Sequence, residues 1–103
     1  MFRQGDVLLV PVKKAKGVPV QAQEGRLVLA RGEATGHHHS IALSDRVAMF
    51  REDGSGGGLF LAVTGAPVAL EHQEHGAIAL PPGAYRVSIQ RVYQSGTVAP
   101  VRD

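Results

Sequence analysis

Short apolar runs, each closed by glycine, proline or polar residues, follow one another along the chain. Within several runs large aliphatic residues alternate with polar or small ones, and no segment shows a sustained 3.6-residue apolar period. A two-residue period is typical of strands that bury one face, whereas an amphipathic helix repeats every 3.6 residues. The pattern therefore predicts an all-β protein. The expected strands cover residues 6–12, 26–31, 37–43, 46–52, 59–64, 68–72, 77–80 and 85–93.

Glycine and proline indicate where these strands reverse. The strands at 46–52 and 59–64 flank the glycine-rich residues 53–58, which predicts a β-hairpin with a mobile tip. Residues 73–76 and 81–83 are expected to form turns, because proline fixes its φ angle and glycine tolerates positive φ. The glycines alone do not indicate a phosphate-binding loop, since neither a helix pattern nor a lysine–serine pair follows them.

Closure of the sheet follows from the number of strands. Roughly seven to eight strands in one small domain should form a small antiparallel β-barrel or sandwich, because an open sheet leaves faces and edges bare. In the longest strand, residues 85–93, alternation places Tyr85, Val87 and Ile89 on the inward face. A chain of 103 residues suits one such domain. We expect a β-barrel domain over residues 1–94 and a flexible tail over residues 95–103.

The composition limits the cellular locations and the kinds of metal site that the chain can have. The chain has no cysteine, so disulfides and thiolate metal sites are excluded. The N-terminal residues lack the apolar core of a signal peptide, and no apolar run approaches the roughly 20 residues of a membrane span. We therefore expect a cytoplasmic protein that does not bind a membrane and that folds alone or as a small homo-oligomer.

The lysines form the one basic tract, Lys13, Lys14 and Lys16, in a chain of net charge +2. A tract of this kind could contact a nucleic-acid backbone. Proteins that bind single strands interleave such charges with aromatic residues, and this tract has none. A solvated loop is the favoured interpretation, and we do not expect nucleic acid as a partner.

Histidine is the one residue type with site chemistry that is clustered. The five histidines fall in two segments, His37-His38-His39 and His72 with His75. Alternation places His37 and His39 on the face of Ile41 and Leu43, and His72 on the face of Val68 and Leu70. If the two strands pair antiparallel, the beginning of one meets the end of the other, and three imidazoles converge.

Three converging imidazoles predict a metal site with open positions for water or substrate. We expect His37, His39 and His72 as ligands. His75 is expected as a fourth ligand or as a general acid or base, and Glu74 as a supporting carboxylate with a catalytic role. His38 and Glu71 should face outward. The alternative to a metal site is that both histidine segments are polar surface loops, which bind nickel or zinc only adventitiously.

Residues 32–39 (GEATGHHH) and 76–83 (GAIALPPG) resemble the two metal-binding motifs of the cupins, which are small β-barrels. The resemblance implies a barrel with a metal held by a His-x-His pair, a nearby carboxylate and a further histidine. In a cupin the last histidine follows the proline–glycine turn, whereas here His72 and His75 precede it. Residues 4–8, 32–37, 74–76 and 80–83 also resemble short bacterial and phage proteins of unassigned function, and that resemblance implies no activity.

Two functional hypotheses follow. The first is a cupin-like β-barrel that binds a divalent transition metal, namely Zn, Fe, Ni or Mn, and acts on a small-molecule ligand; whether it is an enzyme is left open. The second is a non-enzymatic binding or assembly module, of the kind found in phages, whose histidines contact partner subunits.

Overall fold

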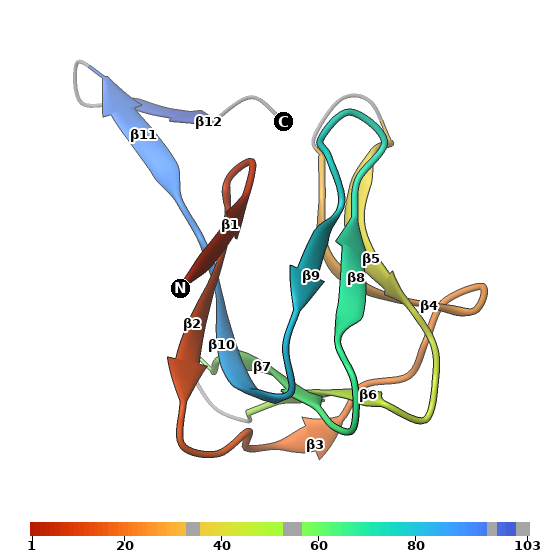
Figure 1. The fold of residues 1–103 in the computed structure, drawn as a ribbon. Helices are drawn as coiled ribbons and strands as arrows, with labels where there is room; N and C mark the ends of the chain where they lie inside the picture. The colour runs from red at the N-terminus through yellow and green to blue at the C-terminus, as the bar shows by residue number, and fades with distance from the viewer. Residues whose placement is uncertain (33–35, 53–56, 95–96, 101–103) are drawn as a thin grey trace.

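The computed structural model describes residues 1–32, 36–52, 57–94 and 97–100, and every regular element among them is a β-strand (Figure 1). The all-β prediction is therefore confirmed. The strands are β1 (Phe2–Gln4), β2 (Val7–Val12), β3 (Val18–Pro19), β4 (Arg26–Arg31), β5 (His38–Ala42), β6 (Val47–Arg51), β7 (Leu59–Val63), β8 (Val68–Glu71), β9 (Ile78–Leu80), β10 (Gly83–Ile89), β11 (Arg91–Gln94) and β12 (Thr97–Pro100). The tip of the β6–β7 hairpin, residues 53–56, lies outside the described residues.

The strands form three antiparallel sheets. The six-stranded sheet has the order β1-β2-β10-β7-β6-β3, the four-stranded sheet the order β4-β5-β8-β9, and β11 pairs with β12. In Figure 1 the six-stranded sheet runs down the left side and across the base, and the four-stranded sheet stands on the right. Within the described ranges no sheet closes on itself, so of the predicted barrel or sandwich the barrel is not seen, and the structure shows antiparallel sheets. Among the described residues the edge strands of the two larger sheets, β1 and β3 in one and β4 and β9 in the other, do not pair with one another.

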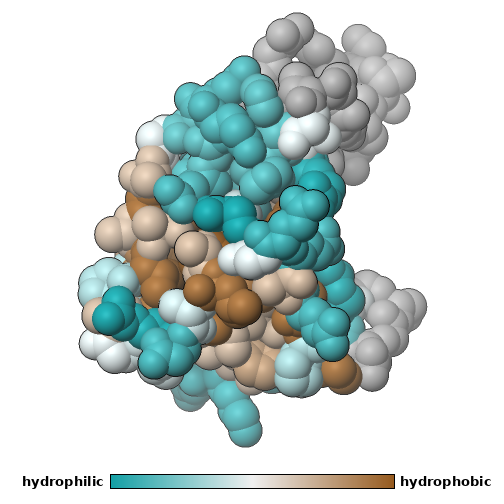
Figure 2. Space-filling view, turned by 90° about the vertical axis from the view of Figure 1, so that its right-hand side faces the viewer, coloured by the Kyte–Doolittle hydropathy of each residue, from teal (hydrophilic) through white to brown (hydrophobic). Residues whose placement is uncertain are grey.

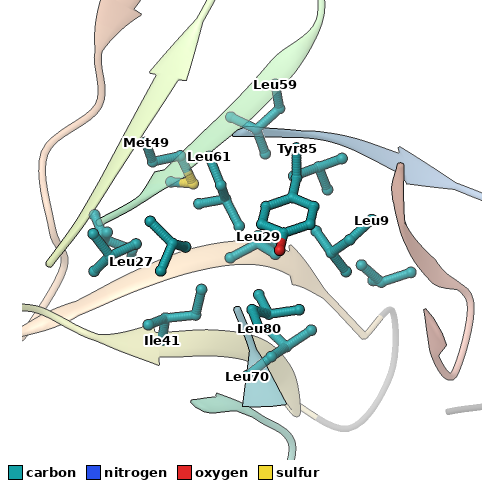
Figure 3. Packing of buried hydrophobic residues seen from close by; sticks show 14 residues of the cluster. Leu9, Leu27, Leu29, Ile41, Met49, Leu59, Leu61, Leu70, Leu80 and Tyr85 are labelled. Carbon is teal, nitrogen blue, oxygen red and sulfur yellow. The ribbon is translucent and has the colours of Figure 1, made fainter. Parts of the chain in front are cut away.

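One hydrophobic core lies between the two larger sheets. Leu9 and Leu61 come from the six-stranded sheet, and Leu70 and Leu80 from the four-stranded sheet; all four side chains are fully buried. Figure 3 shows these side chains pointing toward one another from opposite sides, with Tyr85 between them. Full burial of a leucine contributes about 1.5–3 kcal/mol. The core therefore fixes how the two sheets face each other.

The end of the chain differs from the prediction. The strand expected over residues 85–93 is divided into β10 and β11, and Ile89 is 38% exposed rather than inward. Tyr85 and Val87 are buried as predicted. Within the expected tail, residues 97–100 form β12 and pair with β11, and the flexibility of the tail stays a prediction. The short strands β1 and β3 were not predicted.

Surface chemistry is unevenly distributed. Figure 2 shows, on the side that β4 and β5 occupy in Figure 1, a lower half with many hydrophobic residues and a mostly hydrophilic upper half. The β1–β2 turn, the β8–β9 turn and the segment that leads into β5 all lie at the upper end in Figure 1. Lys13, Lys14 and Lys16 line a separate hollow of about 410 Å³ together with Arg86. Among the described residues there is no helix with the length and hydrophobicity of a membrane span.

The core predicts a sharp contrast between two leucines. Leu61 is fully buried, whereas Leu43 is 55% exposed. We expect Leu61→Ala to lower the free energy of unfolding by about 2–5 kcal/mol, because it leaves a cavity. The matched variant Leu43→Ala should change it by less than about 0.5 kcal/mol. Urea unfolding followed by circular dichroism measures both, and similar losses would contradict the placement of the core.

Tyr85 predicts a loss of stability at alkaline pH. Its hydroxyl donates to the Pro81 carbonyl at 2.6 Å, and burial raises the pKa of its phenol above the ordinary 10.0. A raised pKa means that the folded chain holds the proton more tightly than the unfolded chain. The resulting stabilisation is present below about pH 10 and is lost as the pH rises through the folded-state pKa. Tyr85→Phe should lose about 1 kcal/mol at neutral pH, from the missing hydrogen bond, and should then fall less steeply than the wild type above pH 10. Urea titrations at several pH values measure the free energy of unfolding of both proteins. If it fell equally steeply with pH in the wild type and in Tyr85→Phe, the prediction would be wrong.

Candidate metal centre

The antiparallel pairing of β5 with β8 brings the two histidine segments together. Ser40 lies opposite Glu71 and Ile41 opposite Leu70, so the next residues along, His39 and His72, face each other. Their ring centroids are 4.3 Å apart with an interplanar angle of 37°. The predicted convergence of the two segments is therefore confirmed.

Two further imidazoles join this pair. The His75 ring lies 4.7 Å from His72 and 6.0 Å from His39 between ring centroids. His37, one residue before β5, lies 5.6 Å from His72. We call His37, His39, His72 and His75 the histidine cluster. All four candidate metal ligands thus lie within one group of contacting rings.

Strand alternation separates His38 from His39 and the rest of the cluster. His39 is 1% exposed and His72 is 9% exposed, whereas His38 is half-buried on the opposite face of β5. His38 lines a surface hollow of about 490 Å³ with Arg26 and Arg31. Burial, followed by the charges of Arg31 and Arg26, lowers the pKa of the His38 imidazole below 6.5. His38 therefore lies outside the cluster, as its predicted outward orientation requires.

Gln4, the last residue of β1, and Asp6, in the β1–β2 turn, are two polar residues of the site that sequence reasoning missed. Gln4 is 3% exposed, and its side-chain Nε2 donates to the carbonyls of Leu70, at 2.9 Å, and Gly76, at 3.0 Å. Its Oε1 lies 2.8 Å from His39 Nδ1. Asp6 is 6% exposed, and its Oδ1 lies 3.5 Å from His39 Nε2. The available signal was a glycine between two polar residues, which indicates a turn but not that its side chains point inward.

Gly5, between these two residues, allows the close approach. Its φ is +58°, a conformation that other residues rarely adopt. A Cβ at this position would lie 2.8 Å from His75 Nε2 and 3.2 Å from His39 Cε1. The turn backbone therefore lies directly against two of the imidazoles.

The two glutamates have different surroundings. Glu71 faces outward and forms an ion pair with Arg26 at 2.6 Å, as expected from alternation. Glu74 Oε1 lies 3.6 Å from His37 Nδ1, and the Glu74 side chain is 52% exposed. The Glu74 backbone N–H also donates to His72 Nδ1 at 3.0 Å. Neutral His72 therefore carries its proton on Nε2, because its Nδ1 is an acceptor.

The donor atoms are close but not yet arranged as ligands. Over the described part of the chain, no three histidine, aspartate or glutamate side chains are grouped so that they could hold a metal ion as they stand. His75 Nε2 is buried and has no hydrogen-bond partner among the described residues. It is therefore a buried nitrogen that a metal ion could bind without displacing a described hydrogen bond.

Residues 3–90 match the model of a protein family described as a domain of unknown function, DUF8820. The matched range contains the whole histidine cluster, together with Gln4, Gly5 and Asp6. The chain matches neither a curated protein nor a solved structure.

Gly5 provides a test of the cluster geometry. Gly25 has a similar positive φ, +78°, but a Cβ there would meet nothing within 4 Å. We expect Gly25→Ala to cost about 1 kcal/mol from backbone strain alone. Gly5→Ala should cost at least about 1 kcal/mol more, because its methyl group displaces His75 and His39. Thermal unfolding measures the cost, and NMR of the histidine Cε1–H signals should show a shift for Gly5→Ala alone.

Proposed function

Because the chain belongs to the DUF8820 family, whose function is unknown, we propose from the site itself that this protein binds a divalent transition metal, namely Zn, Fe, Ni or Mn, through the histidine cluster. The observation that carries the proposal is the buried contact between His39 and His72, made by two remote segments, with His75 and His37 beside them. Imidazole nitrogen suits Zn, Fe and Ni, and Mn would rely more on a carboxylate ligand.

The surroundings of the cluster support a cation. Asp6 supplies a buried carboxylate 3.5 Å from His39 Nε2. In the cupins a carboxylate ligand accompanies the histidines. We propose that Asp6, which lies in a turn far from the histidines in the sequence, is the carboxylate ligand here. A carboxylate with two or three imidazoles is a common ligand set for zinc and non-haem iron. The chemistry proposed is therefore cupin-like.

Burial of so many imidazoles otherwise costs stability. A buried polar atom without a partner costs about 1–3 kcal/mol, and His75 Nε2 is such an atom within the described residues. Ligation of a metal ion would offset that cost. The proposed ligands are His39, His72 and His75, with His37 and Asp6 completing the set. Small rotations of the side chains are needed, since the cluster does not already form a coordination shell.

Catalysis is the part of the proposal that depends on the metal. A bound ion would polarise a small-molecule substrate or activate a water molecule. Glu74 is half-exposed beside His37, which suits a group that exchanges protons with solvent. We propose Glu74 as the proton carrier, and His75 as a second one in any state in which it is not a ligand.

Metal binding is tested directly by elemental analysis. Protein produced without a histidine tag and without a nickel column should contain roughly one transition-metal ion per chain, or should take up one on titration with zinc. His39→Ala and His72→Ala should abolish that uptake, because each removes a buried ligand. Bound metal should also raise the midpoint of thermal unfolding, since it binds the folded chain alone.

His38→Ala is the matched control. It removes one of three adjacent histidines from the other face of β5 and should leave metal uptake unchanged. Circular dichroism of each variant without metal separates loss of ligands from loss of folding. Equal losses of uptake in the His38 and His39 variants would show adventitious binding by the three-histidine segment. A metal-free wild type that takes up no ion would refute the proposal and favour an assembly role for the histidines.

A further inference from the structure

Gln4 makes three hydrogen-bonding contacts that together decide how its amide is oriented. Its Nε2 lies within hydrogen-bond distance of two carbonyl oxygens, those of Leu70 and Gly76. A carbonyl oxygen only accepts, so the group that faces both of them must be the NH₂. The reversed orientation would place Oε1 against two other oxygens in a buried site. The Gln4 oxygen therefore faces His39.

The orientation of the amide then decides the protonation of His39. Gln4 Oε1 has no hydrogen to donate, and it lies 2.8 Å from His39 Nδ1. A hydrogen bond between them requires the proton on Nδ1. In the neutral imidazole the other nitrogen, Nε2, then carries a lone pair. That nitrogen is on the side of Asp6, whose Oδ1 is 3.5 Å away.

We propose that Gln4 is a positioning residue that holds His39 in its Nδ1–H form and presents the Nε2 lone pair for a metal ion. Metal-bound histidines generally donate their second ring N–H to an oxygen acceptor, which fixes the ring and strengthens the ligand. Gln4 supplies this acceptor before any ion arrives. The step from protonation to metal affinity rests on the proposed function, whereas the protonation of His39 does not.

Gln4 also connects the three segments of the site. It lies at the end of β1, contacts His39 in β5, and reaches the end of β8 and the β8–β9 turn through Leu70 and Gly76. The same Gln4 amide makes all three contacts. A displacement of the turn that carries His72 and His75 would therefore also weaken the hydrogen bond between Gln4 Oε1 and His39 Nδ1. The position of the turn and the protonation of His39 are thereby coupled.

The test is nitrogen-15 NMR of the histidine rings in metal-free protein at about pH 8.5, where an ordinary imidazole is neutral. Wild-type His39 should be protonated on Nδ1 alone. In Gln4→Met, which keeps the side-chain length but lacks the acceptor, the proton should move to Nε2, where Asp6 can accept it. Zinc affinity should fall about 10–100-fold in the same variant. A wild-type His39 protonated on Nε2, or on both nitrogens, would overturn the proposal.

A second variant covers the case in which Gln4→Met does not fold. Gln4→Glu keeps an oxygen acceptor for Nδ1–H but loses the two donations to Leu70 and Gly76. It should be less stable than the wild type and yet keep the Nδ1–H form. If Gln4 were merely structural, Gln4→Met would lose stability with no change in the His39 ring signals. Nδ1–H in a wild type that binds no zinc would refute the proposed function alone, and zinc binding with another form of His39 would refute the positioning role alone.

Discussion

The antiparallel pairing of β5 with β8 is the constraint on which the histidine end of the molecule depends. It sets Ser40 opposite Glu71, and from that register His39 necessarily faces His72. A shift by one residue would turn His39 outward and His38 inward, because successive side chains of a strand point to opposite faces. Ile41 and Leu70, fully buried in the same paired strands, oppose such a shift. The core that holds the sheets together therefore also holds the imidazoles in contact.

The sequence was informative wherever the deciding interaction is local. Strand alternation depends only on neighbouring residues, so the inward orientation of His39 and His72 and the outward orientation of Glu71 could be predicted. The β6–β7 hairpin and the turn between β8 and β9 follow from glycine and polar residues between apolar runs. Convergence of the two histidine segments needed one further assumption, that their strands pair antiparallel, and the structure has this pairing although β6 and β7 lie between β5 and β8 in the chain.

The parts that could not be predicted depend on contacts between remote residues. β1 has three residues and only one of them, Phe2, is apolar, so no alternation identified it. Gln4 and Asp6 therefore resembled ordinary turn residues, although their partners lie in β5, at the end of β8 and beyond it. The barrel prediction failed for a related reason. Whether a sheet closes depends on which edges meet in space, and among the described residues the edge strands β1, β3, β4 and β9 do not pair with one another.

The two central imidazoles differ in where they hold the proton. Gln4 favours a proton on Nδ1 of His39, whereas the Glu74 N–H requires a bare Nδ1 on His72. A metal ion can thus take Nε2 of His39 while the contact between Nδ1 and Gln4 stays in place, but at His72 the ring proton must first move to Nδ1. There it would meet the Glu74 N–H, so the turn at 73–76 has to release that amide. Because Gln4 is bonded to the same turn through Gly76, the protein cannot complete the ligand set without adjusting the segment that carries His75. Within the proposed function, uptake of the ion and rearrangement of this turn are therefore one event.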